Sequence, residues 1–170
     1  MTYSTPGVYV EEISKFPPSV AQVQTAIPAF IGYTEKAQTK IQGDLNLVPT
    51  RITSMLEYET YFGFPANETA ITVTVASDGN IIANAPGASA SPFIMYYSMQ
   101  MYFANGGGPC YITSVGQYKY PKVTSPPTIV TTVVFDDLLK GLEEVRKEDE
   151  PTLLIFPDAT SLTDQSKFYN

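Results

Sequence analysis

The stretch Tyr102–Gly116, YFANGGGPCYITSVG, holds the residues that most resemble a chemical site, three consecutive glycines followed by a cysteine. A phosphate-binding loop needs its glycines after a strand and before a helix, so that helix N–H groups point at the anion. Here the order is reversed, because a helical pattern precedes Gly106 and a strand pattern follows Cys110. The exposed helix end would present carbonyl groups, which repel anions. The glycines are therefore predicted to end a helix and turn the chain into a strand.

Cys110 and the acidic residues offer few ways to build a catalytic site. The sequence contains no histidine, which removes the commonest general base and metal ligand and rules out Ser-His-Asp and Cys-His sites within this chain. No cation adjoins Cys110 in the sequence, so we expect a buried and inert thiol. Glu11 and Glu12 are neighbours in a strand-like segment and would point to opposite faces, which does not suit a shared metal.

Asp158 is the one carboxylate in a position of interest, because it follows the apolar run TLLIF at the expected carboxyl end of a parallel strand. Folds of the α/β class place functional groups there. A single carboxylate without a partner base is more typical of a turn or a helix cap, near Thr163 and Asp164. We therefore expect no catalytic residue, no cofactor and no metal site, and Asp158 remains the residue on which an α/β hydrolase alternative would depend.

The composition narrows the classes of partner. The 170 residues carry a net charge of −7 with only ten Lys and Arg, which disfavours nucleic acid and anionic membrane surfaces. The single cysteine allows no internal disulfide, no signal peptide is visible, and no apolar run approaches the length of a membrane span. A hydrophobic content of 44% is enough for a packed core.

The elements that must position these residues follow from local patterns. Ala26–Glu35 contains a short apolar strand that ends at Gly32, and 53–63 reads as a helix with Ser54 as its cap, Glu57 as its capping-box partner and Gly63 at its end. Its apolar side is assigned to Met55, Leu56, Tyr58, Tyr61 and Phe62. Residues 71–85 read as a hairpin around Asp78-Gly79.

The second half of the chain alternates helix and strand. Ser91 and Pro92 are predicted to open a helix that is apolar nearly all round and therefore buried. A strand from Cys110 to Val115, a helix from about Asp137 to Glu148 and a strand in TLLIFPDAT then form a βαβ unit. Leu138, Leu142 and Val145 are expected on one face of that helix. The fold class is thus α/β, with α+β character in the N-terminal part.

The first 24 residues read as an extended arm broken by Pro6, Pro17 and Pro18. Between these prolines lies one strand-like segment, which consists of Gly7, Val8, Tyr9, Val10, Glu11, Glu12 and Ile13. A lone short strand cannot pair with itself, so it needs a sheet edge in its own subunit or in another one.

Three separated segments resemble the contractile tail sheath proteins of phages and of phage-tail-like extracellular injection systems. They are TPGVYVEEI followed by AIPAFIGYTE, then YYSMQMYFANGGGPCYITSVG, then TLLIFPDAT, and they occur in the order of that family. The resemblance implies an N-terminal arm, residues 1–24, and then the first part of a non-catalytic, subtilisin-like α/β sheath domain, residues 25–116, with a hairpin insertion near 71–85. A linker at 117–135 and the start of the α/β core at 136–170 would follow.

The resemblance also implies a role and partners. Sheath subunits form stacked rings around an inner tube and contract together, and the arm links neighbouring subunits by adding a strand. The implied partners are other sheath subunits, the inner tube protein through regions outside this chain, and baseplate components, with assembly in the cytoplasm of the producing cell. Sheath proteins continue well past residue 170, so the chain is expected to be a fragment. A baseplate or adaptor protein that shares the same opening is a further alternative.

Overall fold

The computed structural model describes residues 26–68, 71–84, 90–120, 130–164 and 166. Its elements in chain order are β1 (Pro28–Thr34), β2 (Thr50–Ile52), α1 (Met55–Phe62), β3 (Thr72–Val75), β4 (Ile81–Asn84), α2 (Met95–Ala104), β5 (Cys110–Gln117), α3 (Phe135–Val145), β6 (Leu153–Ile155) and the 3-10 helix η2 (Pro157–Ser161). The arm with its segment 7–13, and part of the expected linker, lie outside the described residues.

The main sheet has four strands in the order β2-β5-β1-β6. Strands β5 and β6 both run parallel to the central strand β1, and β2 pairs antiparallel with β5. The chain passes from β1 to β5 on one side and then crosses to β6 on the other side of β1. The α/β fold class is therefore confirmed, and the carboxyl ends of β1 and β6 form the point where the strand order reverses.

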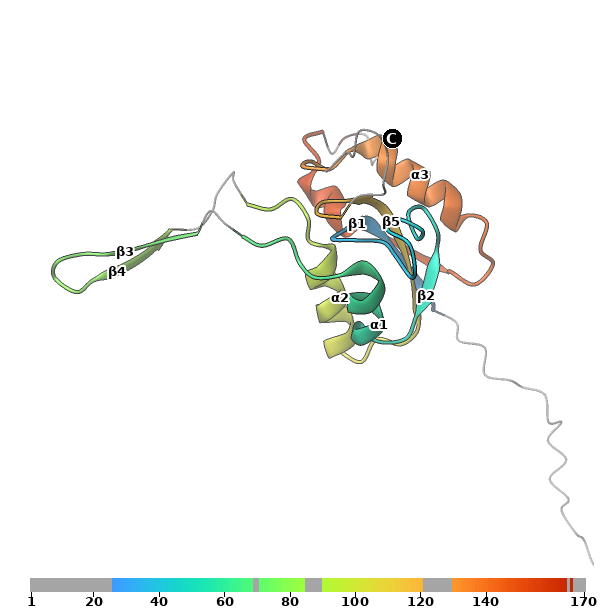
Figure 1. Ribbon diagram of the computed structural model, residues 1–170, viewed down its shortest axis with the longest axis horizontal. Coiled ribbons are helices and arrows are strands. Elements are labelled where there is room, and N and C mark those ends of the chain that lie inside the picture. The colour runs from blue at the N-terminus through green and yellow to red at the C-terminus, as the bar shows by residue number, and fades with distance from the viewer. Residues whose placement is uncertain (1–25, 69–70, 85–89, 121–129, 165, 167–170) are drawn as a thin grey trace, which may run out of the picture.

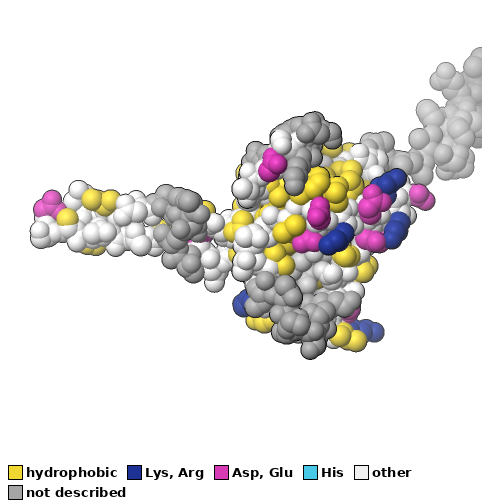
Figure 2. All heavy atoms as spheres, turned by 90° about the horizontal axis from the view of Figure 1, so that it is seen from above, with side chains coloured by type: hydrophobic (Ala, Val, Ile, Leu, Met, Phe, Trp, Pro, Cys, Tyr) yellow, Lys and Arg dark blue, Asp and Glu magenta, His cyan; other side chains and the backbone are white. Residues whose placement is uncertain are grey.

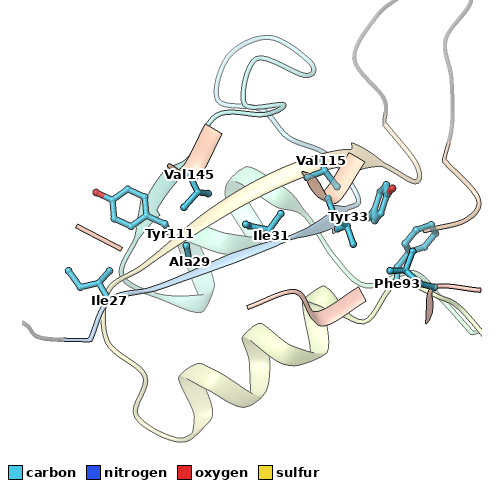
Figure 3. Packing of buried hydrophobic residues seen from close by; sticks show 10 residues of the cluster. Ile27, Ala29, Ile31, Tyr33, Phe93, Tyr111, Val115 and Val145 are labelled. Carbon is cyan, nitrogen blue, oxygen red and sulfur yellow. The ribbon is translucent and has the colours of Figure 1, made fainter. Parts of the chain in front are cut away.

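Helices cover both faces of this sheet, with α3 on one face and α1 and α2 on the other (Figure 1). The side chains of β1 alternate between the two layers, as a strand with a period of two requires. Ala29, Ile31 and Tyr33 join the cluster beneath α3, and Phe30 joins the cluster with α1 and α2. Figure 3 shows the first cluster, in which residues of β1 lie beside Tyr111 and Val115 of β5.

Helix α1 forms where the capping pattern predicts it. The Ser54 hydroxyl accepts a hydrogen bond from the Glu57 N–H at 3.3 Å, and the Glu57 carboxylate accepts one from the Thr53 N–H at 2.6 Å. Gly63 ends the helix with a φ of 85°. The assignment of Leu56 to the apolar side is wrong, because this side chain is 73% exposed. Tyr58 and Phe62 instead fill the buried face.

Helix α2 departs from the prediction at its start and in its burial. It begins at Met95, its N-cap residue is Ile94, and the Ser91 hydroxyl accepts only from the nearby Phe93 N–H. Only Met95 and Met99 are buried, while Tyr97 is 44% and Met101 67% exposed. The helix packs on the sheet by one side, so the expectation of a helix buried all round is wrong for the described residues.

The glycine turn after α2 is a helix end, as predicted. Asn105 caps the helix, the Gly106 N–H donates to the Phe103 carbonyl, and the Gly107 N–H donates to the Tyr102 carbonyl. These two bonds are those of a Schellman motif, which needs a left-handed residue after the cap. Gly106 supplies it with a φ of 82°. The chain then enters β5 directly.

Helix α3 and strand β6 complete the predicted βαβ unit, although α3 begins and ends earlier than the predicted 137–148 and β6 differs in its position. Leu138 and Val145 are buried on the sheet side of α3, in agreement with its predicted apolar face. The continuous apolar run predicts that β6 lies inside a parallel sheet, but β6 forms the edge of the described sheet, where Leu153 is 54% and Leu154 46% exposed. In the described sheet β6 has a neighbouring strand, β1, on one side only. Its other edge is open, which leaves Leu153 and Leu154 partly exposed despite the apolar run.

Candidate functional site

Asp158 begins the candidate site, because it lies where α/β folds place functional groups, directly after β6 at the strand-order reversal. It belongs to η2 and its side chain is fully buried. One carboxylate oxygen, Oδ2, accepts a hydrogen bond from the Tyr33 N–H at 2.7 Å. The other, Oδ1, accepts from the Ile94 N–H at 2.7 Å and the Met95 N–H at 3.1 Å.

This arrangement makes Asp158 the N-terminal cap of α2 across 64 positions of sequence. The first N–H groups of a helix need acceptors from outside the helix, and a carboxylate suits them by both hydrogen bonding and charge. The sequence left a turn or a helix cap near Thr163 and Asp164 as the two roles for Asp158. The structure shows a helix cap, but the capped helix is the distant α2. An anion site at this helix end is thus filled by the protein itself.

Gly32 explains how the carboxylate reaches the centre of the sheet. A Cβ atom at position 32 would lie 2.6 Å from Asp158 Oδ2, so any larger residue would displace the carboxylate. The pairing of β1 with β5 also shifts register between Gly32 and Tyr33, beside the N–H group that donates to Asp158. Burial raises the pKa of Asp158 to about 6, although the three backbone donors act in the opposite direction.

Tyr33 binds the start of α3, on the other face of the sheet, as Asp158 binds the start of α2. Its hydroxyl accepts a hydrogen bond from the Val134 N–H at 3.0 Å and donates to Asp137 Oδ2 at 3.1 Å, at the start of α3. Burial is the main cause of a raised pKa for this phenol, which keeps it protonated. Tyr33 and Asp158 therefore fasten the starts of two helices to the carboxyl end of β1.

Glu35 is the second buried carboxylate at this end of the sheet. It accepts a hydrogen bond from the Phe64 N–H at 2.8 Å and pairs with Lys119 Nζ at 2.7 Å. Gly63 packs directly against Glu35, since a Cβ atom at position 63 would overlap the Glu35 carboxylate. The pair joins the segments that follow β1, α1 and β5. Sequence reasoning missed it, because only the fold brings residues 35, 64 and 119 together.

A shallow hollow of about 380 Å³ adjoins this pair, with Phe93, Tyr118 and Val130 among its lining residues. Phe93 and Tyr118 stack with ring centroids 5.0 Å apart, so the floor is apolar. The ammonium group of Lys119 is engaged by Glu35, and Asp158 is sealed beneath the surface. Lys119 is thus the one charged side chain among the described residues that line the hollow, and it is already paired.

The other candidate residues remain apart from Asp158. Cys110 is buried at the start of β5, and burial raises the pKa of its thiol to about 12, as expected for an inert cysteine. Among the described residues, no group of three or more Cys, Asp and Glu side chains could hold a metal ion. No helix in the described ranges is long and apolar enough to cross a membrane.

The segment 7–13, proposed from the sequence as an inter-subunit strand, lies outside the described residues, so the structure does not test it. The hairpin is described, and it pairs β3 with β4 in the predicted place. Its tip is closed by a bond from the Gly79 N–H to the Ala76 carbonyl. All eight strand residues of the hairpin are exposed.

Comparisons with known proteins find similarity among solved structures. No family model matches the sequence, and no curated protein matches it. The chain is similar to one in the 6-fold symmetrised cryo-EM structure of the anti-feeding prophage (AFP) baseplate, with 28% sequence identity and a TM-score of 0.43. The similarity covers 94% of this chain and 35% of that chain, so this chain spans about a third of its length.

Proposed function

We propose that this chain is a structural subunit of a contractile tail sheath, which surrounds an inner tube and drives its ejection when the whole lattice contracts. The sequence resemblance carries the proposal. The first resembling segment contains β1. The second covers most of α2, the glycine turn and most of β5, and the third covers β6 and most of η2. The resemblance therefore extends over three of the four strands of the main sheet, β1, β5 and β6, and over one of its helices.

The geometry around Asp158 supports a role without catalysis. A hydrolase of the α/β type would need this position open to a substrate, and here the carboxylate is buried and holds three backbone N–H groups. The α/β layers then act as a rigid body that carries contact surfaces. This is the requirement for a subunit that moves as a unit within a lattice.

The arm supplies the proposed link between subunits. Residues Gly7–Ile13 add a strand to a sheet of a neighbouring subunit, so that backbone hydrogen bonds form across the interface. Such a tether can persist while the bodies rotate and repack. The partners are then other sheath subunits, with the inner tube and baseplate contacted through parts outside this chain, in a particle assembled in the cytoplasm of the producing cell.

Contraction by this mechanism needs no fuel site in the subunit. An extended lattice can be metastable and can relax when the bodies form better contacts with one another. The energy is then stored in the contacts between subunits during assembly.

Electron microscopy of particles that contain the protein tests the proposal. Stacked rings or tubes labelled along their whole length by an antibody to this chain are the expected result. Label confined to one ring at the end of a tail would instead identify a baseplate or adaptor protein. A monodisperse monomer with hydrolytic activity would overturn the proposal in favour of an enzyme.

The arm is tested by charging one of its faces. Val8→Lys combined with Val10→Lys places two charges on one side of the segment, and we expect subunits that fold but form no long sheaths. Thr2→Lys combined with Thr5→Lys adds the same charge outside the segment and serves as the matched control. Long sheaths formed by the Val8 and Val10 variant would contradict strand addition by this segment.

A further inference from the structure

Asn105 is the one described asparagine that a glycine follows, and it lies exposed at the carbonyl end of α2. An asparagine loses its side-chain amide most readily before glycine, because glycine has no Cβ atom to shield its backbone nitrogen. The dipeptide Asn105-Gly106 can therefore react with itself. The other described asparagines precede larger residues, and they are Asn46, Asn67, Asn80 and Asn84.

The reaction consumes water and needs no cofactor. The backbone nitrogen of Gly106 bonds to Asn105 Cγ and gives up its proton to the departing amide group, while the Cγ–Nδ2 bond breaks and ammonia leaves. Water then opens the cyclic imide that has formed. Cleavage of its bond to Cγ yields aspartate. Cleavage of its bond to the backbone carbonyl carbon yields isoaspartate, in which the main chain runs through the former side chain.

Several features of the folded turn oppose this ring closure. The Gly106 N–H, whose nitrogen must attack, donates to the Phe103 carbonyl at 3.1 Å. The Asn105 side chain is held as well, because its Nδ2 donates to the Met101 carbonyl at 2.7 Å. Ring closure also aligns the Gly106 nitrogen with the Asn105 Cβ about the Cα–C bond, and the observed ψ of 18° is far from that arrangement. The reaction therefore requires the last turn of α2 to open first.

We propose that Asn105 is a deamidation site controlled by the end of α2, which reacts only when this turn opens and then prevents the turn from closing. Helix ends open at a small cost in free energy, far below that of global unfolding. The site can therefore react in a chain that is otherwise folded. This inference is independent of whether the chain serves in a sheath or in a baseplate.

The product does not fit the turn in which it forms. Aspartate and isoaspartate lack the Nδ2 donor, so a carboxylate oxygen would face the Met101 carbonyl. The carbonyl end of a helix carries partial negative charge, which repels this carboxylate. Isoaspartate also adds a methylene group to the main chain, where the bonds of Gly106 and Gly107 fix the path into β5. Each opening that leads to reaction thus leaves a permanent change between α2 and β5.

The hairpin tip contains the other described dipeptide that can close such a ring readily, Asp78-Gly79. Figure 2 shows an acidic side chain at the far end of the hairpin, and Asp78 is the one acidic residue within 71–84. An ionised carboxylate is a poor target for a backbone nitrogen. Ring closure and hydrolysis at an aspartate also return the original mass. A gain in mass of the corresponding peptide therefore reports reaction at Asn105 and not at Asp78.

Peptide mapping by mass spectrometry tests whether the fold controls the site. The native chain and the guanidinium-unfolded chain are incubated at mildly alkaline pH, and the converted fraction of Asn105 is followed with time. We expect conversion at least about tenfold slower in the native chain, since opening must precede reaction. Equal rates in the two states, or no conversion in the unfolded chain, would overturn the proposal.

A matched pair of variants separates the turn from the dipeptide, which both variants leave unchanged. Gly107→Ala places a Cβ atom 2.5 Å from the Tyr102 ring and should open the turn, whereas Gly108→Ala places one in open space. The two should react equally when unfolded, and native Gly107→Ala at least about threefold faster than native Gly108→Ala. Circular dichroism checks that both variants fold. Equal native rates would exclude control by the turn, and if Gly107→Ala does not fold, the comparison of native and unfolded chain decides.

Hydrogen exchange tests the effect of the product. Asn105→Asp reproduces the aspartate product, and Asn105→Ala removes the same donor without adding charge. The amides of Gly106 and Gly107 should exchange faster in both variants than in the native chain, and fastest in Asn105→Asp. Unchanged exchange in Asn105→Asp would refute the claim that the product prevents the turn from closing.

Discussion

Asp158 illustrates how a residue in a functional position can serve the fold alone. Its two oxygens satisfy the first N–H groups of α2 and one N–H of β1, which joins three elements at the reversal point of the sheet. The cost is the burial of a carboxylate, which raises its pKa to about 6 from an ordinary 3.8. This cost makes stability depend on pH in a predictable direction.

The contribution of Asp158 to stability should fall as the pH rises through the weakly acidic range. Between about pH 4 and pH 6 the unfolded chain loses the Asp158 proton while the folded chain keeps it, so the free energy of unfolding decreases. The total effect is on the order of 3 kcal/mol. Urea unfolding of the native chain and of Asp158→Asn, which lacks this titration, should show a difference in stability that shrinks from pH 4 to pH 7. A difference that stays constant would contradict this account.

Gly106 provides a second prediction at the residue scale, with a control two residues away. Gly106→Ala places a Cβ on a residue with a φ of 82°, and the left-handed conformation should cost about 1 kcal/mol. Gly108 has no positive φ, and a side chain there would enter open space, so Gly108→Ala should change stability by less than about 0.5 kcal/mol. Thermal unfolding of both variants measures the difference, and equal effects would argue against the Schellman turn.

At the scale of elements, the close approach of α3 to the sheet depends on Gly141. This residue is buried in the middle of the helix, directly over β1 and β5. A Cβ there would lie 2.5 Å from Val115 Cγ1 and 2.6 Å from Ile31 Cγ2. Both neighbours are β-branched and cannot rotate away easily.

Gly141→Ala should therefore destabilise the fold, although alanine is the better helix former by about 1 kcal/mol. Overpacking of this kind costs about 1–3 kcal/mol, and the sum is a net loss. Denaturant unfolding checks the prediction against Gly108→Ala. A gain in stability would mean that α3 lies further from the sheet than the structure places it.

At the scale of the whole molecule, the hydrophobic core of the described residues lies in the α/β body, which consists of the main sheet with α1, α2 and α3, and the hairpin lies outside this core. The body contains both hydrophobic clusters, and neither includes a residue of β3 or β4. Glu68 and Ser91 hold the base of the hairpin together through a bond from the Ser91 N–H to Glu68 Oε1 at 2.8 Å. The body should thus keep its structure when the hairpin is removed.

Replacement of residues 71–84 by a short Gly-Ser linker should change the unfolding free energy by less than about 1 kcal/mol, because all eight strand residues of the hairpin are exposed. Amide exchange should retain the protection of β1 and β5. A large loss of stability would show that the hairpin packs on the body.

Local spacing in the sequence was sufficient for much of the secondary structure. The cap at Ser54, the hairpin turn near Asp78-Gly79 and the helix end at Gly106 were all predictable, because each depends on hydrogen bonds within a few residues. The α/β class followed in the same way from the alternation of helix and strand. The sequence also shows directly that the chain contains no histidine, which excludes Ser-His-Asp and Cys-His catalytic sites within it.

Only the tertiary structure decided what these elements do together. Asp158 caps a helix 64 residues away, β6 lies at an edge, and one side of α2 remains exposed. These outcomes depend on which distant segments come into contact. A run of apolar residues has the same sequence pattern in an element that is covered on both sides and in an element that is covered on one side. The sequence thus indicated a role in assembly through its resemblance to sheath proteins, and the fold showed which apolar side chains of the described residues remain exposed.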